Sequence, residues 1–358
     1  MATYDQEYWQ VIEPMAKAQA AQPMPPPKNC LEIRARSRKF MEAVLQRMPF
    51  PENVTETRID VVTPDGHTVP VYRYATAEQL ARKDQPVVLY MHGGGMVSAS
   101  AQLYRTLMAT QVIDFGVQHF AVDYRLAPEA TAPVMLEECY SVLAYLSGHA
   151  AALGIDAARI GVAGDSAGGG LATGVTLMAR DRSLQPPVAK LIVLYPMLDD
   201  RTVQRHPPKG ARLSGASTTD DDWAKRSVLV WSTEQNAMAW AAYLGLGNPG
   251  TDGALEAATA LTEATANDAG TLPSTITPYS VPARAESLVG MPSTYIDVGA
   301  LDLFLEEAVH FAAKLARDSV EFDFHVLHGL PHAYNQVAPS ITAAQSARAL
   351  QKGAYTSF

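Results

Sequence analysis

Short continuous runs of hydrophobic residues, separated by longer amphipathic stretches, recur through most of the chain. Runs of this kind predict strands that are buried on both faces of a sheet. The predicted strands of this type are residues 86–91, 117–122, 160–163, 190–195, 293–298 and 321–327. Helical patterns lie between several of them, at residues 133–153, 169–178 and 303–317. Strands that alternate with helices predict an α/β fold with a mostly parallel central sheet and helices on both faces.

The part of the chain before this alternation has a different pattern. Residues 4–20 and 31–48 have the hydrophobic spacing of two amphipathic helices, with a proline-rich segment between them. Residues 58–63 and 69–74 then alternate as strands do, and Pro64-Asp65-Gly66 between them is a turn signal. We therefore expect two helices added before the core, followed by a β-hairpin.

The alternation of strands and helices stops between residues 199 and 279. This segment is rich in Ala, Thr, Gly and Asp, with a predicted helix at 233–244 and a low-complexity run at 245–277. A gap of this size between core strands indicates an insertion. Because the run offers few large side chains to bury, we expect it to be the most mobile part of the insertion.

All four tryptophans lie outside the predicted strands. Trp9 belongs to the first helix, and Trp223, Trp231 and Trp240 belong to the insertion. We expect the N-terminal helices and the insertion to meet as one helical cap over the core. The predicted division is 1–50 as the N-terminal part of the cap, 51–199 as the first part of the core, 200–280 as the cap insertion and 281–358 as the second part of the core.

Composition limits the classes of partner. The chain has 358 residues and a formal net charge of −9, with no basic cluster, which argues against binding to nucleic acid or to anionic membranes. The N-terminus lacks the pattern of a signal peptide and no apolar run reaches membrane-spanning length, so we expect a cytoplasmic protein without membrane insertion. Cys30 and Cys139 are too few for a disulfide framework.

The strongest chemical signal is the segment Gly164-Asp165-Ser166-Ala167-Gly168, which follows a predicted strand and precedes a predicted helix. This G-x-S-x-G pattern in that context predicts a nucleophile elbow, in which a sharp turn lifts the Ser166 hydroxyl above the sheet. Glycines on both sides remove side chains that would collide in the turn. A phosphate- or dinucleotide-binding turn is the alternative, but no lysine follows the glycines and their spacing differs from G-x-G-x-x-G.

A serine nucleophile needs a base and a group that orients the base. On an α/β sheet with this turn, the acid and the histidine are expected after later strands. Asp302 lies in the loop after strand 293–298, whereas Asp297, inside that strand, is the lesser alternative. His332 lies beyond the last strand, in a loop that can reach back across the sheet.

The histidines near the end of the last strand also suggest a second kind of site. His325, His328 and His332 have a spacing that could bind a metal ion on a helix. Because His325 belongs to a predicted strand, no single helical face would gather the three, and we expect no metal. The role of His328 stays open.

Donors for an oxyanion are expected from His92-Gly93-Gly94-Gly95, directly after the strand 86–91. Glycines there allow the backbone to approach a carbonyl oxygen, and such a loop is the known partner of the nucleophile elbow. We expect the amides of Gly93, Gly94 and Ala167 to be the donors.

Taken together, the motifs resemble those of the hormone-sensitive lipase family of α/β-hydrolases, which includes the bacterial family IV esterases. The matching segments are HGGG at 92–95, DYRLAPE at 123–129, GDSAGG at 164–169, YPMLD at 195–199, VGALD at 298–302 and GLPHAY at 329–334. The resemblance implies an α/β-hydrolase fold with a helical cap. It also implies a Ser166–His332–Asp302 triad.

The expected function is a serine carboxylic-ester hydrolase that acts on small esters of short to medium acyl chains through a covalent acyl-enzyme, without a cofactor. The alternatives are acyl transfer, hydrolysis of an amide or carbamate, and elimination. A further alternative is a non-catalytic receptor on the same fold. Met96, Asp165, Trp231 and Trp240 are expected to line the substrate pocket. The chain could form a homodimer.

Overall fold

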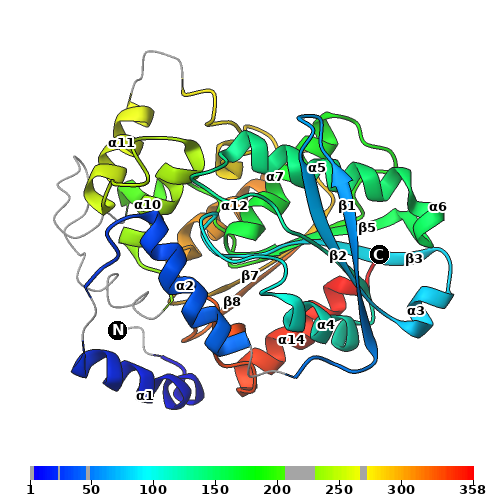
Figure 1. Cartoon of the computed structure of the whole chain (residues 1–358), viewed down its shortest axis with the longest axis horizontal. Coiled ribbons are helices and arrows are strands. Elements are labelled where there is room, and N and C mark those ends of the chain that lie inside the picture. The colour runs from blue at the N-terminus through cyan, green and yellow to red at the C-terminus, as the bar shows by residue number, and fades with distance from the viewer. Residues whose placement is uncertain (1–3, 23–24, 46–48, 206–229, 267–271) are drawn as a thin grey trace.

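A sheet of eight strands runs through the centre of the molecule in the computed structural model (Figure 1). The structure describes residues 4–22, 25–45, 49–205, 230–266 and 272–358. The strands are β1(Val54–Val62), β2(Thr68–Thr76), β3(Gln85–Met91), β4(Gln118–Val122), β5(Ile155–Asp165), β6(Lys190–Leu194), β7(Ser293–Gly299) and β8(Phe322–Leu327). Each of them overlaps a strand predicted from the sequence, with ends that differ by a few residues.

The order of the strands across the sheet is β1-β2-β4-β3-β5-β6-β7-β8. β1 and β2 form the predicted antiparallel hairpin, in which Val62 lies opposite Thr68, and β2 is also antiparallel to β4. All other neighbouring strands are parallel. Parallel neighbours bring their carboxyl ends to one edge, so the loops after β3, β5, β7 and β8 can meet there.

Helices cover both faces of the sheet. Figure 1 shows α4(Arg105–Phe115) and α14(Thr342–Tyr355) on one face, and α5(Ala132–Gly148), α7(Ala167–Asp181) and α12(Leu305–Arg317) on the other. This double cover explains the continuous hydrophobic runs, since every residue of β4 and β6 is buried. The predicted α/β-hydrolase architecture is therefore confirmed.

Four helices of the described residues lie outside the sheet and the helices that cover it: α1(Gln6–Ala21), α2(Cys30–Leu45), α10(Thr233–Leu244) and α11(Ala254–Ala266). α10 packs against both α2 and α11, so the second N-terminal helix and the insertion do meet. The division into cap and core at the predicted boundaries stays a prediction, and Trp223 lies outside the described residues. The shorter elements are α3(Ala77–Ala81), α6(Ala150–Leu153), α8(Thr202–Arg205), the 3-10 helix η1(Pro282–Arg284) and α13(Tyr334–Val337).

The low-complexity run at 245–277 is more regular than its composition suggests. Much of it forms α11, whose Ala257, Ala258 and Leu261 are buried. Small alanine side chains allow two helices to approach closely, which gives this helix a packing partner in α10 without large residues. The expected mobility of the run stays a prediction.

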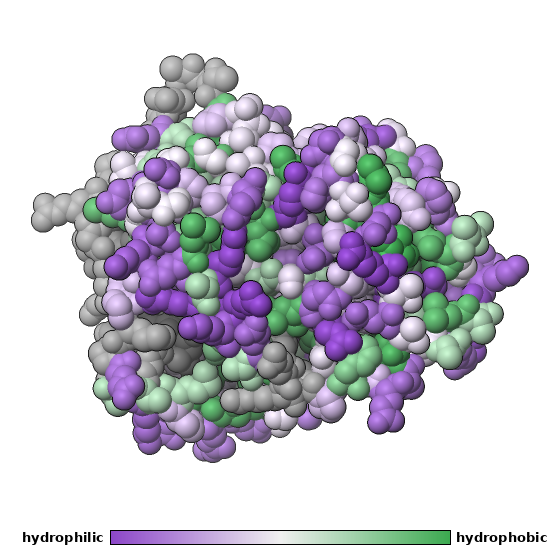
Figure 2. All heavy atoms as spheres, viewed as in Figure 1, coloured by the Kyte–Doolittle hydropathy of each residue, from purple (hydrophilic) through white to green (hydrophobic). Residues whose placement is uncertain are grey.

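Polar and apolar side chains are interspersed over the described residues on the face shown in Figure 2. The most exposed large apolar side chains are Val62 and Val289, which lie far apart in the sequence. Among the described residues, no helix is both long and apolar enough to cross a membrane.

Candidate active site

The G-x-S-x-G segment forms a tight turn between β5 and α7. Ser166 has φ +54° and ψ −122°, a backbone conformation that costs free energy in a residue other than glycine. A Cβ atom on Gly164 would lie 2.3 Å from the backbone oxygen of Gly168, and one on Gly168 would lie 2.1 Å from that of Met91. Both glycines are therefore required by backbone packing around the serine.

The three residues predicted as a triad lie within hydrogen-bond distance of one another. His332 Nε2 is 2.9 Å from Ser166 Oγ, and His332 Nδ1 is 2.8 Å from Asp302 Oδ2. All three residues are buried. The arrangement orients one imidazole nitrogen toward the hydroxyl and the other toward a carboxylate, as a serine nucleophile requires. The catalytic roles themselves stay predictions.

Neighbouring side chains hold this arrangement in place. The second carboxylate oxygen of Asp302 accepts a hydrogen bond from the backbone N–H of Phe304 at 2.9 Å. The rings of Phe304 and Tyr195 meet the His332 ring edge to face, with centroids 5.1 and 4.9 Å away. The imidazole is thus fixed by packing as well as by its hydrogen bonds.

Asp297, the alternative acid, has other partners. Its carboxylate accepts hydrogen bonds from Gln351 Nε2 at 2.8 Å, from the Tyr295 hydroxyl at 3.1 Å and from the Tyr334 hydroxyl at 3.3 Å. Complete burial raises the pKa of Asp297 to about 6. These contacts place it beneath the histidine loop, which makes it a support of that loop rather than a partner of His332.

The histidine cluster does not gather in the structure. His325 lies on β8, where its ring packs near that of Tyr295. Within the described part of the chain, no group of three His, Cys, Asp or Glu side chains could hold a metal ion.

The first glycine of the HGGG loop differs from its prediction. The backbone N–H of Gly93 donates to Asp165 Oδ1 at 3.0 Å, so it is not available to an oxyanion. Gly94 and Gly95 instead lie at the cavity together with Ser166. No acceptor among the described residues is bonded to their amides. We therefore replace Gly93 by Gly95 as a donor, while Ala167 keeps its place at the first position of α7.

Asp165 borders the cavity, as the sequence predicted, and its carboxylate also lies against this loop. Its carboxylate is buried and accepts hydrogen bonds from four groups: the Tyr90 and Tyr104 hydroxyls, the Gly93 amide and the Gln336 side chain. Burial raises the pKa of the Asp165 carboxyl, and hydrogen bonds from the tyrosines act against that shift.

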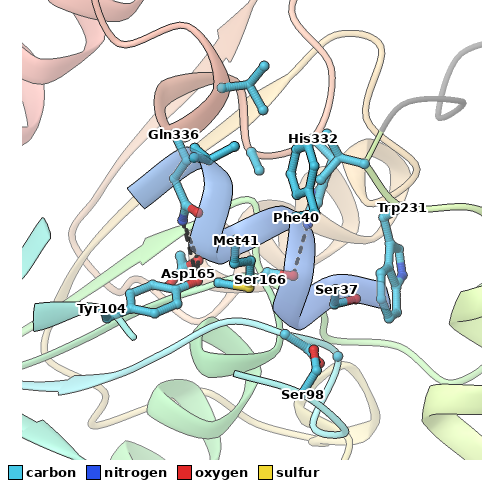
Figure 3. Close-up of a pocket in the computed structure, with 16 residues that line it drawn as sticks. Ser37, Phe40, Met41, Ser98, Tyr104, Asp165, Ser166, Trp231, His332 and Gln336 are labelled. Carbon is cyan, nitrogen blue, oxygen red and sulfur yellow. Dashed lines mark hydrogen bonds between the residues drawn. The ribbon is translucent and has the colours of Figure 1, made fainter. Parts of the chain in front are cut away.

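A cavity opens above Ser166, between the catalytic loops and α2 (Figure 3). Its lining is mainly apolar, with a few hydroxyl and amide groups, one carboxylate and one imidazole: Ser37, Phe40, Met41, Val44, Gly94, Gly95, Ser98, Tyr104, Asp165, Ser166, Val230, Trp231, His332, Ala333, Gln336 and Val337. Of the predicted pocket residues it includes Asp165 and Trp231. Met96 and Trp240 are buried but do not line the cavity, and the indole of Trp240 packs against Tyr243 of the same helix.

The wall that the sequence analysis missed is one face of α2. Ser37, Phe40, Met41 and Val44 recur at helical spacing and all line the cavity. The amphipathic pattern of residues 31–48 was the available signal. Such a pattern predicts that one face of a helix is buried, but it does not identify the residues that this face contacts. Figure 3 shows this helix passing over Ser166, with Trp231 at one end of the cavity and Tyr104 at the other.

Comparisons with known proteins agree with this geometry. Residues 88–336 match the family model described as alpha/beta hydrolase fold. The chain is 34% identical to an ethyl acetate hydrolase of Pseudomonas putida over 54% of this chain and 59% of that protein. It is 28% identical to the esterase LipI of Mycobacterium tuberculosis over 86% of this chain and 85% of that one.

Two further likenesses concern the structure and the subfamily. The solved structure of a bacterial heroin esterase superposes with a TM-score of 0.74 at 28% identity, covering 99% of this chain and 97% of that one. The chain is also 35% identical to the hormone-sensitive lipase of Mus musculus, over a stretch that covers 33% of this chain and 15% of that protein. The chain therefore belongs to the α/β-hydrolase fold family, within its hormone-sensitive lipase group.

Proposed function

We propose that this protein hydrolyses small carboxylic esters, with Ser166 as the nucleophile. The observation that carries the proposal is the continuous hydrogen-bonded array from Ser166 Oγ through His332 to Asp302. It lies at the floor of a mainly apolar cavity, beside free backbone amides. Relatives that are named esterases support the same reaction class.

Acylation begins when Ser166 Oγ attacks the ester carbonyl carbon and His332 Nε2 takes the hydroxyl proton. The carbonyl oxygen becomes an oxyanion, which the amides of Gly94, Gly95 and Ala167 stabilise. The C–O bond to the alcohol then breaks, and His332 gives its proton to the departing oxygen. Asp302 orients the imidazole and stabilises its charged form.

Deacylation repeats these steps with water. His332 takes a proton from a water molecule, whose oxygen attacks the acyl carbon of the acyl-enzyme. The bond to Ser166 Oγ breaks, the proton returns to that oxygen, and the free acid leaves.

The cavity supports a preference for short to medium acyl chains. Phe40, Met41 and Val44 from α2, with Trp231, enclose the space above Ser166, so a small apolar group fits against them. The cavity has a volume of about 70 Å³, which favours a small group over a long acyl chain. The name of the Pseudomonas relative, an ethyl acetate hydrolase, is in keeping with a small ester.

The test is hydrolysis of p-nitrophenyl esters of rising acyl length by the wild-type protein and by Ser166→Ala. We expect activity that falls toward long chains, and a loss of several powers of ten in the variant, which stays folded. Ser346→Ala is a matched control, because that hydroxyl is exposed and bonds only a carbonyl of its own helix. Hydrolysis by Ser166→Ala at the wild-type rate would refute the proposal.

A homodimer and a cytoplasmic location are further proposals that derive from the sequence. Sedimentation of the purified protein tests the first, and fractionation of the source cells tests the second.

A further inference from the structure

Asp165 bonds to four groups from three other segments of the chain around the nucleophile. Its Oδ1 accepts hydrogen bonds from the Tyr90 hydroxyl at 2.8 Å and from the Gly93 amide at 3.0 Å. Its Oδ2 accepts them from the Tyr104 hydroxyl and from Gln336 Nε2, both at 2.9 Å. Because all four partners donate, the ionised carboxylate is the form that satisfies them, and it leaves no oxygen unpaired.

Each donor belongs to a part of the site that must be placed accurately. Gly93 directly precedes the two glycines whose amides face the cavity, and Gln336 follows His332 by four residues. Tyr90 lies on β3, and Tyr104 is the residue before α4. Figure 3 shows Gln336 reaching Asp165 from the side of the histidine loop, next to Ser166.

The carboxylate also explains why the first residue after His92 is a glycine. A Cβ atom on Gly93 would lie 2.5 Å from Asp165 Oδ2 and 3.0 Å from the Tyr104 hydroxyl. The missing side chain therefore makes room for Asp165 rather than for a substrate carbonyl. An aspartate at position 165 in the GDSAG segment thus requires a glycine at position 93 in the HGGG segment.

We propose that Asp165 is a positioning residue. It borders the cavity, but its carboxylate bonds to protein groups and holds the oxyanion loop and the histidine loop in register with Ser166. This role rests on the proposed ester hydrolysis. It acts through Gly93 on the amides of Gly94 and Gly95, and through Gln336 on the segment that carries His332.

Asparagine has nearly the shape of aspartate but cannot replace it without a rearrangement of its neighbours. Its amide oxygen can accept two hydrogen bonds, whereas its NH₂ group would face two groups that donate in the wild-type chain, in either orientation. If the NH₂ group faces Tyr104 and Gln336, the Tyr104 hydroxyl must turn to accept and the Gln336 amide must rotate to present its oxygen, or these two contacts are lost. We expect kcat to fall roughly 10- to 100-fold in Asp165→Asn, because displacements of about 1 Å can cost up to 10²-fold. KM should change little.

Gln336→Glu provides a test with opposite results in two backgrounds. In the wild-type chain it places a second carboxylate within hydrogen-bond distance of Asp165, and the repulsion should lower kcat. In Asp165→Asn, the new carboxylate can accept from the Asn NH₂ group and from the Tyr104 hydroxyl, so kcat should rise. A residue needed only for folding would not show this reversal.

The experiment measures kcat, KM and the affinity for a trifluoromethyl ketone, which forms a tetrahedral oxyanion on the serine, in the wild type, both single variants and the double variant. Loss of affinity for the ketone should parallel loss of kcat. Asp181→Asn is the control, since that side chain bonds only surface groups, and its kinetics should match the wild type.

Wild-type kinetics and ketone affinity in Asp165→Asn would overturn the positioning role, as would an equal loss from Gln336→Glu in both backgrounds. Hydrolysis by the wild type and its loss in Ser166→Ala test the ester hydrolase function separately. The two proposals can therefore fail independently.

Discussion

Consecutive glycines of the HGGG loop have different neighbours and so different roles. Gly93 lies against Asp165, whereas Gly95 has φ +65° and lies against the indole of Trp231. A Cβ atom on Gly95 would be 2.2 Å from Cη2 of that ring. An alanine there meets both an unfavourable backbone conformation and a rigid neighbour.

Gly95→Ala should lower kcat/KM by roughly 10- to 100-fold, because the loop must shift its amides relative to Ser166. Gly95→Ala with Trp231→Ala should recover part of the loss, since the indole is then absent. Gly148→Ala is the control, because a Cβ atom there would meet nothing within 4 Å. Steady-state kinetics on a short ester measure all of these, and no recovery in the double variant would contradict the clash.

The two buried aspartates of the histidine region should differ in catalysis. Asp302→Asn should lower kcat by about 10³–10⁴-fold, because an amide beside Nδ1 favours the wrong imidazole tautomer. Asp297→Asn should lower it much less, since that side chain contacts Tyr295, Tyr334 and Gln351 instead. Single-turnover rates compare the two variants. A larger loss of rate in Asp297→Asn than in Asp302→Asn would show that Asp297, and not Asp302, orients His332.

Asp297 should also make stability depend on pH. Its pKa is about 6 in the folded chain and 3.8 in the unfolded reference, so the folded state binds more protons between these values. The stabilisation is complete below pH 3.8 and is lost as the pH rises through about 6. At about 1.4 kcal/mol per pKa unit, the loss is about 3 kcal/mol.

Denaturant unfolding between pH 4 and 8 measures this loss. In Asp297→Asn, the contribution of this side chain to the decline in unfolding free energy should disappear. A decline equal to that of the wild type would show that other groups cause it.

At the scale of elements, α2 is both a wall of the cavity and a helix anchored to the core. Arg34, one turn before Ser37, donates to the carboxylate of Glu129 through two nitrogens and to the carbonyl oxygens of Val97 and Ala127. Val97 follows the oxyanion loop by two residues. The same side chain therefore fixes the helix relative to the catalytic floor.

Arg34→Gln should raise KM for short esters with little change in kcat, because it loosens a wall that contacts ground state and transition state alike. A loss of about 1 kcal/mol in the free energy of substrate binding would raise KM roughly fivefold. The change in stability should be small, since Glu129 is largely exposed. Arg38→Gln is the matched control, because Arg38 pairs only with Glu42 of the same helix. Equal KM values in the two variants would contradict the anchoring role.

At the scale of the whole molecule, the sheet supplies the polar catalytic groups and the added helices supply much of the apolar wall. α1 contributes Tyr8 and Ile12 to the hydrophobic core, and its Asp5 amide donates to Gly329 of the loop that leads to His332. Residues far apart in sequence thus support one site.

A chain that begins at residue 49 should keep the sheet but lose activity. It lacks Phe40, Met41 and Val44 of the cavity wall and uncovers the apolar side chains beneath them. We expect stronger binding of a hydrophobic dye, a raised KM and a weaker preference among acyl lengths. Far-ultraviolet circular dichroism checks that the core has folded. An unchanged acyl preference would show that the core alone selects the substrate.

The sequence by itself determined the strands, the order of the motifs and the three residues of the Ser166–His332–Asp302 array. Buried parallel strands must be continuously apolar, and a serine at a sharp turn needs glycines on both sides, so both leave a local pattern. Helices with polar groups on one face, such as α12, also produce a recognisable periodicity in the sequence. α4 produced no such periodicity, because its buried residues point to most sides of the helix.

Only the tertiary structure decided which partners these residues meet. The chain order does not place β4 between β2 and β3, nor does glycine spacing show that Gly93 donates to Asp165 while Gly95 lies against Trp231. Likewise, the hydrophobic face of α2 lines the cavity, whereas Trp240 is buried away from it. A local pattern indicates which side chains are buried. The contacts between distant segments depend on how the elements pack, and this packing positions the groups for chemistry.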